Sequence, residues 1–499
     1  MKKIVIIGGG IAGLSAGIFA QKNGFESIIV EKHHTLGGEC TGWDRQGYHI
    51  DGCIHWLVGT KEGTQIHDLW TTVGAFDGAL IYHPESFMAV EHNGVTVHFY
   101  RNLEKMKSSW LEISPEDKAQ IEVLCNDIKR LHSFSIPADK PADMMNLLEK
   151  VKYLLSMKDI GPVMQKYGKI RVNELASKFK HPALREAIAS FMPEGDESAI
   201  SVLFPLGTFT SGQSSIPKGG SKALAMRMME RYLSLGGTVE ASCEVVEADI
   251  NGQVVKRIKC KNGKSFEADY YIAACDAKVL YDQLLKGRYP DQAFEKRYNN
   301  PDVYPLASNI YVAIGYAGDM NDIPRTLKFS VKSVDIKQNQ KPIAYLQMTH
   351  YGYEPDFAPK GHSVITFAIN QFKPELDAWE ALVKDKKAYD REKTRIGEAV
   401  IGAMETRFSH MKGKLKLLDV ATPQTYVRYC NAYRGAFMGF WPTISGKPLN
   451  HNGHIKGLDN MLLSGQWLQP PGGLPVAVMT GKDTIMRICN KEKQQFVKA

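Results

Sequence analysis

Residues 1–32 read MKKIVIIGGGIAGLSAGIFAQKNGFESIIVEK, and this stretch decides the fold. Two lysines followed by a long apolar run are the pattern of a secretory signal or a membrane anchor. The same residues also fit a strand, a phosphate-binding loop and a helix, followed by a second strand. The spacing of the glycines distinguishes the two interpretations.

Three glycines follow a short β-branched run at residues 4–7. The run is typical of a strand that is buried on both faces of a parallel sheet. Gly8 permits a tight turn, Gly10 lets the backbone approach a pyrophosphate, and Gly13 lets a helix pack closely on the strand. Glycine-rich turns also occur for packing alone, so this fingerprint depends on what surrounds it.

The residues after the glycines complete a dinucleotide-binding unit. A helical pattern covers residues 11–23 and ends at Gly24, where a C-terminal cap is expected. A second strand at 27–30 leads to Glu31, which lies 18 residues after Gly13. A carboxylate at this place accepts hydrogen bonds from the ribose hydroxyls of an adenosine. A signal peptide needs none of these features, so we interpret the opening as a cofactor site.

The composition is that of an ordinary globular protein. With 499 residues the chain is too long for one simple core, so we expect two closely associated domains. The eight cysteines show no metal-ligand spacing, which predicts a reduced, cytoplasmic protein without a metal site. The formal net charge of +8 is compatible with an anionic membrane surface but does not require one. We expect no transmembrane helix and no nucleic-acid partner.

A second glycine pair narrows the choice of dinucleotide. Residues 32–59 read KHHTLGGECTGWDRQGYHIDGCIHWLVG, with the pair at Gly37 and Gly38. Together with the earlier glycines and Glu31, this segment resembles the phytoene desaturase-like flavoproteins, which include carotenoid isomerases and retinol saturases. Glycines here let a loop cover the second side of a pyrophosphate, which a fold that binds only nicotinamide does not need.

Two later stretches carry the resemblance further. Residues 216–242 indicate a loop and a helix leading into a strand, and a β-meander with Asn-Gly turns at 251–252 and 262–263 follows. Residues 457–488 resemble the closing motif of the family: a strand at 461–464, a glycine turn, and a helix that starts beyond Gly473. The N-terminus of that helix is expected to point at the flavin edge where negative charge accumulates.

The resemblance implies FAD as the cofactor and a set of residues that contact it. These are Gly8, Gly10, Ile11, Ala12, Gly13, Glu31, Lys32, Gly37, Gly38, Glu39, His55, Val246, Gly465, Gln466, Gly473, Leu474 and Val476. Two of them depart from the family, which often has arginine where this chain has Glu39 and usually has aspartate where it has Gln466. The amide oxygen of glutamine still accepts a hydroxyl proton, so we expect FAD binding to survive.

The expected fold is α/β, with a Rossmann-like FAD domain of the glutathione-reductase type and a mixed α+β substrate domain. The FAD domain is discontinuous and comprises residues 1–90, 215–290 and 450–499. Residues 91–214 and 291–449 form the substrate-binding domain, which is expected to pack over the flavin ring.

Catalytic candidates are residues that the resemblance brings beside the flavin. His55 is expected to hydrogen-bond flavin or substrate, although a buried histidine satisfied by backbone fits the same pattern. We assign Cys53 to packing. Tyr433 and Arg434 are candidates for polarising a substrate carbonyl or supplying a proton, and an aromatic core with a surface arginine is the alternative.

Residues 144–157 read MMNLLEKVKYLLSM and have clear helical spacing. One face carries Met144, Leu147, Leu148, Val151 and Leu155, and the lysines lie elsewhere. Such a stripe usually faces a core, which is the interpretation we adopt. The alternative is a basic amphipathic helix that rests on a membrane at the mouth of a lipid tunnel.

These features predict an FAD-dependent oxidoreductase that desaturates, saturates or isomerises carbon–carbon bonds of an apolar polyene or isoprenoid substrate by hydride transfer at flavin N5. No second glycine fingerprint is present, so electrons are expected to pass to or from a diffusing donor or acceptor. One alternative is a flavin amine oxidase or protoporphyrinogen-oxidase-like enzyme. Another is a flavin-free prenyl-binding escort protein, which shares the architecture.

Overall fold

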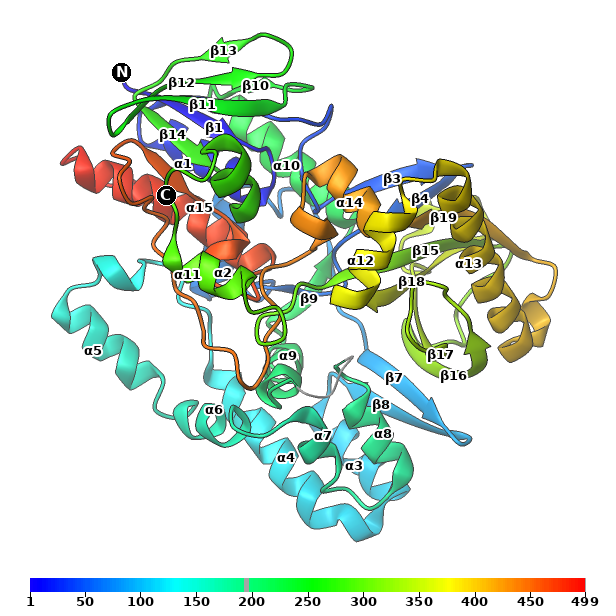
Figure 1. The fold of residues 1–499 in the computed structure, drawn as a ribbon. Helices are drawn as coiled ribbons and strands as arrows, with labels where there is room; N and C mark the ends of the chain where they lie inside the picture. Colours follow the sequence, from blue (N-terminus) through cyan, green and yellow to red (C-terminus); the bar gives the residue numbers. More distant parts are fainter. Residues whose placement is uncertain (193–196, 499) are drawn as a thin grey trace.

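The computed structural model describes residues 1–192 and 197–498. Two β-sheets lie at opposite sides of the molecule, and a group of helices lies below them in the view of Figure 1. The chain crosses between these regions several times, so segments far apart in the sequence lie side by side. The two regions and the helices enclose the cavity described below.

The first sheet is parallel and has the strand order β10-β2-β1-β14-β20. Its strands are β1 (Lys3–Ile7), β2 (Glu26–Val30), β10 (Thr238–Glu240), β14 (Tyr270–Ala273) and β20 (Met461–Leu463). All five come from the three segments predicted to form the cofactor domain, although the domain boundaries themselves stay a prediction. The first βαβ unit has the predicted elements, with α1 (Ile11–Lys22) between β1 and β2 and Gly24 in a left-handed conformation just after the helix.

Different elements cover the two faces of this sheet. On one face α1 packs against α10 (Gly220–Ser234) and α15 (Leu474–Lys491). On the other face lies a three-stranded antiparallel sheet of β11 (Val245–Asn251), β12 (Val254–Cys260) and β13 (Ser265–Phe266). The predicted Asn-Gly turns join these three strands, as the register of their pairing confirms.

The second sheet has seven strands in the order β19-β15-β18-β17-β16-β7-β8. They are β7 (Ser86–His92), β8 (Val95–Tyr100), β15 (Ser308–Tyr316), β16 (Thr326–Val334), β17 (Ile343–His350), β18 (Ser363–Gln371) and β19 (Leu415–Ala421). Apolar residues on one face pack against the long helix α13 (Lys386–Arg407). The opposite face is turned to the cavity.

The helices below the sheets form a separate core. They are α3 (Leu103–Ile113), α4 (Lys118–Arg130), α6 (Gly161–Tyr167), α7 (Val172–Ala176), α8 (Pro182–Ala189) and α9 (Ile200–Thr210), and α5 (Leu147–Ser156) lies outside this core. Smaller elements connect the regions: α2 (Gln65–Thr72), α11 (Gln292–Tyr298), α12 (Lys373–Leu382), α14 (Pro423–Cys430), β3 (Gly42–Arg45), β4 (Tyr48–Asp51), β5 (Leu57–Val58), β6 (Ile81–Tyr82) and β9 (Ser214–Pro217).

The predicted packing of helix α5 is wrong. No residue of α5 is buried, and its apolar residues are among the most exposed in the molecule, with Leu147 at 77% and Leu155 at 66%. In Figure 1 the helix projects at the lower left, at the edge of the molecule. An amphipathic pattern identifies an apolar face but not the medium that covers it. Within residues 1–192 and 197–498, no helix has the length and apolar character that crossing a membrane requires.

Candidate active site

The glycine loop after β1 meets the packing demands that its spacing predicts. A side chain on Gly8 would strike the carbonyl oxygen of Ala274 at 2.5 Å, and one on Gly13 would strike the carbonyl oxygen of Gly8. In contrast, a Cβ on Gly10 would meet nothing closer than the carbonyl oxygen of Gly37, at 3.9 Å. The backbone at Gly10 therefore borders open space in the cavity, and a side chain there would fill it.

The second glycine pair closes on the first loop. The N–H of Gly37 donates to the carbonyl of Gly9 at 2.9 Å, and Gly10 and Gly37 form an isolated β-bridge. Gly37 and Gly38 both have left-handed φ angles, of 121° and 59°, which glycine adopts at low cost. The two loops thus form one backbone cradle of the kind that suits a pyrophosphate.

Glu31 lies at the end of β2 and is buried. Its carboxylate accepts hydrogen bonds from the N–H groups of Gly9 and His33, both at 2.7 Å. Burial raises the pKa of Glu31, and these hydrogen bonds oppose the rise. The neighbouring Lys32 also borders the cavity and pairs with Glu244 at 3.5 Å. Glu31 is therefore held at the cavity wall where an adenosine ribose is expected.

The C-terminal helix begins at the opposite wall of the same cavity. Gly473 caps α15 with a φ of 86° and no side-chain capping bond, and Pro475 occupies its first turn. The N–H of Gly473 donates to Oε1 of Gln466 at 3.1 Å. Leu474 and Val476 line the cavity, so their free helix-terminal N–H groups and the helix dipole favour negative charge there.

Glu39 and Gln466 meet across the cavity wall. Nε2 of Gln466 lies 3.4 Å from Oε2 of Glu39, although the two residues are 427 positions apart in the chain. Desolvation and the nearby charge of Asp276 raise the pKa of Glu39 to about 8. Burial likewise raises the pKa of Asp276 to about 6. Glu39 is therefore mainly a neutral carboxylic acid at pH 7, and it adds little negative charge to the cradle.

His55 borders the cavity as a neutral imidazole. Burial and the guanidinium of Arg325 lower the pKa of His55 to about 4. Nη2 of Arg325 donates to the backbone carbonyl of His55 at 3.1 Å, which fixes this segment of the loop. Cys53 packs against the core around β1 and also faces the cavity. Neutral His55 has one ring N–H to donate and one ring nitrogen that accepts.

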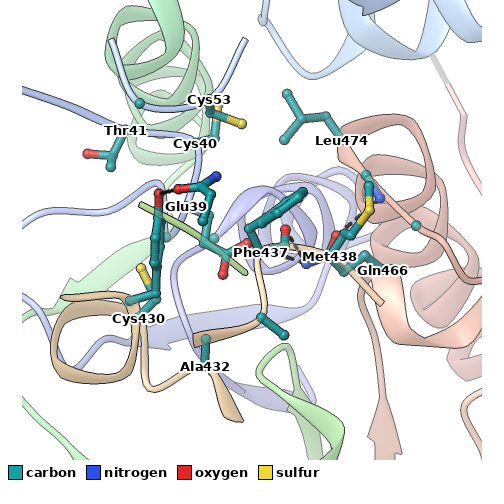
Figure 2. Close-up of a pocket in the computed structure, with 18 of the residues that line it drawn as sticks. Glu39, Cys40, Thr41, Cys53, Cys430, Ala432, Phe437, Met438, Gln466 and Leu474 are labelled. Carbon is teal, nitrogen blue, oxygen red and sulfur yellow. Dashed lines mark hydrogen bonds between the residues drawn. The ribbon is translucent and has the colours of Figure 1, made fainter. Parts of the chain in front are cut away.

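All of these groups face one continuous cavity of about 1680 Å³. Figure 2 shows Glu39, Cys53, Phe437 and Leu474 arranged around it. Typical small-molecule sites measure about 300–1,000 Å³, so this cavity has room for a dinucleotide and a second molecule. Besides the glycine loops and the α15 N-terminus, its walls come from the seven-stranded sheet, from helices α6 and α9 and from residues 190–192, which follow α8.

Four predicted site residues lie outside the cavity lining: Gly13, which packs against Gly8, and Val246, Tyr433 and Arg434. Val246 is 42% exposed, and Val245 lines the cavity in its place, because a bulge shifts the register of β11 between 245 and 247. Arg434, whose φ is 56°, pairs instead with Glu380 at 2.9 Å and with Asp377. Tyr433 contributes its backbone N–H to Asp276 at 3.0 Å. These placements correct the predicted contacts with flavin or substrate.

Three residues that the sequence analysis did not identify as site residues also border the cavity. Asp276 follows β14 at the carboxyl edge of the parallel sheet, where polar groups at a ligand crevice are expected. Tyr426 donates a 2.7 Å hydrogen bond to Oδ1 of Asn309, and this pair joins α14 to the seven-stranded sheet. Asp276 could have been predicted from its position directly after a strand of the parallel sheet. No local sequence pattern indicates that Tyr426 and Asn309 form a pair.

The chain is similar to a known domain family and to known enzymes. Residues 6–73 match the model of the NAD(P)-binding Rossmann-like domain. The chain is 22% identical to a 1-hydroxycarotenoid 3,4-desaturase of Flavobacterium, over 98% of this chain and 99% of that protein. It is 23% identical to the human all-trans-retinol 13,14-reductase, over 87% of this chain and 77% of that one. This protein is an FAD-dependent oxidoreductase that resembles the phytoene desaturases.

A solved structure of similar fold is putrescine oxidase bound to putrescine, with a TM-score of 0.61 and 13% identity over 98% of this chain and 99% of the other. At this identity the likeness concerns the fold alone. Amine oxidases therefore share the architecture of this enzyme, but the function of an amine oxidase agrees less well with its sequence relatives. A flavin-free escort protein disagrees with them, because those relatives are oxidoreductases.

The residues of the enzyme fit FAD. The open space at Gly10 accommodates a pyrophosphate, Glu31 lies where the ribose hydroxyls bind, and the α15 N-terminus faces the flavin end of the cradle. The departure at Glu39 does not oppose this fit, because its carboxyl is mostly protonated at neutral pH. The individual contacts with FAD stay predictions.

Proposed function

We propose that the enzyme changes the saturation or geometry of carbon–carbon double bonds in an apolar polyene or isoprenoid molecule. The observation that carries this proposal is the apolar part of the cavity lining. It comes from strand β7, from the residues that follow α8 and from helix α9, and comprises Phe87, Met88, Phe191, Met192, Ile200 and Phe204. Such walls bind a long apolar chain by excluding water from it.

FAD, when bound, supplies the acceptor or donor of a hydride. The residues of the chain supply the charges and the proton donors and acceptors around the cofactor. The helix-terminal N–H groups at Leu474 and Val476 favour negative charge at their end of the cavity. Glu39 holds a proton on its carboxyl group at neutral pH, and the imidazole N–H of His55 is available for a hydrogen bond. Apolar walls keep water away from the reacting carbons.

The test is a half-reaction followed at the flavin absorbance band. Purified enzyme loaded with FAD is mixed without oxygen with all-trans-retinol, and in parallel the chemically reduced enzyme is mixed with the same polyene. Bleaching of the oxidised flavin, recovery of the oxidised flavin, or a change of polyene geometry without either supports the proposal. Bleaching by putrescine with no response to the polyene would instead favour an amine oxidase.

The proposal includes contact with a membrane through α5. Its exposed leucines form an apolar surface, and Lys150, Lys152 and Lys158 supply positive charge that complements anionic lipid. The helix α6 follows directly, and its Met164 lines the cavity while 41% of it is exposed. An apolar substrate can therefore pass between the bilayer and the cavity at this end of the enzyme.

Co-sedimentation with phosphatidylserine vesicles tests this contact. The enzyme is expected to sediment with the vesicles, and replacement of all three α5 lysines by glutamate is expected to abolish sedimentation while FAD stays bound. The matched control replaces the exposed Lys384, Lys386 and Lys387, which lie at the start of α13 on the other side of the molecule (Figure 1). Equal sedimentation of both variants and the unaltered enzyme would refute a role for α5.

A further inference from the structure

The face of the seven-stranded sheet that is turned to the cavity is polar. On the opposite face the side chains are apolar and pack against α13. The cavity face carries Asn309 on β15, Asn370 on β18, Gln347 on β17 and Lys328 on β16. Asn309 already accepts a hydrogen bond from Tyr426, but a wall that served only a hydrocarbon would leave the ammonium group of Lys328 without a partner, which costs free energy when water is displaced.

The register of the sheet arranges these side chains in order. Asn309 pairs with Asn370, and Gln347 pairs with Lys328, so the two pairs lie on adjacent strands of one face. Neighbouring strands are about 4.8 Å apart. Because β16 is the third strand from β15, Lys328 lies about 14 Å from β15 across the sheet. The polar groups therefore extend away from the cofactor toward one ammonium group.

Lys328 is the charged group at the end of this row. Desolvation lowers its pKa, and the charge of Glu186 opposes that effect. Glu186 itself accepts a hydrogen bond from Oγ of Ser190 at 2.8 Å. Among the residues that the structure describes, Lys328 makes no ion pair or side-chain hydrogen bond, and its closest recorded charge contact is the ring of Tyr345 at 5.3 Å. Its ammonium group borders the cavity.

The cavity lining thus has an apolar part and a polar part that carries the positive charge of Lys328. We propose that the substrate is an amphiphile, a polyene or isoprenoid chain that ends in a carboxylate bound by Lys328. This inference rests on the proposed function and specifies its substrate class. An ammonium group donates hydrogen bonds and accepts none, so it selects an anionic group over an amine. Gln347 lies directly opposite Lys328 on the neighbouring strand, so its amide N–H can donate to the same carboxylate.

Binding of a fluorescent polyene acid tests this subsite. The FAD-loaded enzyme is titrated with cis-parinaric acid and, separately, with its methyl ester, which keeps the chain and removes the charge. The acid is expected to bind more tightly than the ester. Lys328→Met keeps the length of the side chain and is expected to weaken acid binding about tenfold to a hundredfold, the usual effect of losing a charged hydrogen bond, with little change for the ester.

The control is Lys332→Met, because Lys332 is an exposed residue of the same strand β16 outside the cavity lining. This variant is expected to bind both probes like the unaltered enzyme. Equal affinity of the unaltered enzyme for acid and ester would overturn the carboxylate subsite and leave the polyene function standing. Failure of both probes to bind would refute the polyene function itself.

Discussion

Cofactor binding is expected to depend on pH through Glu39. This residue stands where relatives often have arginine, and its carboxyl borders the cradle that fits the pyrophosphate. Its pKa of about 8 means that it is mostly neutral below that pH and carries a negative charge above it. The charge would repel the pyrophosphate and disfavour binding. FAD affinity is therefore full near pH 7 and falls as the pH rises through 8.

The size of the effect follows from the pKa. About nine tenths of Glu39 is neutral at pH 7 and about one tenth at pH 9, so affinity falls about tenfold if only the neutral form binds FAD. That loss equals about 1.4 kcal/mol. Neighbouring groups do not change charge in this interval: Asp276 has a pKa of about 6, and burial raises the pKa values of Tyr426 and Cys430. Gln466 does not titrate.

The assay is quenching of FAD fluorescence by the cofactor-free protein between pH 7 and pH 9. Glu39→Gln keeps the shape of the side chain and its contact with Gln466, and its affinity for FAD is expected to be independent of pH. The same pH dependence in both proteins would assign the titration to another group. A flat profile in the unaltered protein would refute the assignment of a proton to Glu39.

Four further substitutions test the site and the anchoring of helix α15. Gly10→Val is expected to abolish FAD binding in the same assay, because the new side chain fills the open space of the cradle. His55→Ala is expected to keep FAD but slow the flavin half-reaction about tenfold to a hundredfold, whereas Cys53→Ser changes it far less; rapid-mixing absorbance distinguishes these outcomes. Lys482→Met is expected to lower the unfolding midpoint in urea by the equivalent of about 3–5 kcal/mol, because it leaves the buried carboxylate of Asp483 without its partner.

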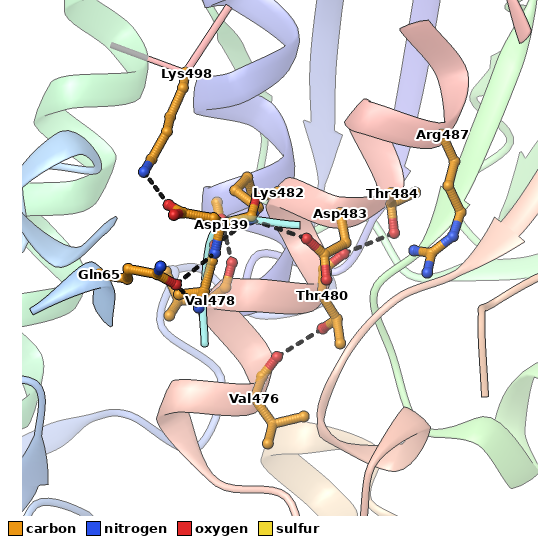
Figure 3. A network of polar contacts seen from close by, with 12 residues as sticks. Gln65, Asp139, Val476, Val478, Thr480, Lys482, Asp483, Thr484, Arg487 and Lys498 are labelled. Atoms are coloured by element: carbon orange, nitrogen blue, oxygen red, sulfur yellow. Dashed lines mark hydrogen bonds and ion pairs between the residues drawn. The ribbon is translucent and has the colours of Figure 1, made fainter. Parts of the chain in front are cut away.

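The environment of Lys482 explains the size of the last effect. Figure 3 shows its buried ammonium group between α15 and the segment that precedes α5. The group donates to the carbonyls of Ala138 and, at 2.8 Å, Asp139, and it lies 3.1 Å from Asp483. One turn further along, Arg487 pairs with Asp143 at 2.7 Å. Helix α15 therefore anchors the segment that leads to α5.

The elements that sequence patterns predicted well are those with local signals. The helix expected at residues 11–23 is α1 (Ile11–Lys22), and the helix expected beyond Gly473 begins at Leu474. Each has a period or a turn residue that acts on its immediate neighbours. Long-range pairing has no such signal, and the parallel contact of β7 with β16 was not anticipated.

The errors in the candidate site have the same origin. A single bulge exchanged Val245 for Val246 at the cavity, and a left-handed residue at Arg434 turned that segment toward α12. Both depend on one backbone angle or one extra residue, which composition does not reveal. The exposed position of α5 was also hidden, because the same amphipathic spacing serves a protein core and a lipid surface.

The contact between Glu39 and Gln466 also has a consequence for how the protein is made. A ribosome adds about 5–20 residues per second, so the 427 positions between the two residues take roughly 20–85 seconds to synthesise. During that time the first glycine loop has emerged, but the strand β20 and the helix α15 that complete the cradle have not. The apolar walls that have already been made stay open to water until these last elements arrive. Aggregation during synthesis is therefore a hazard that ends only when the C-terminal elements complete the cradle.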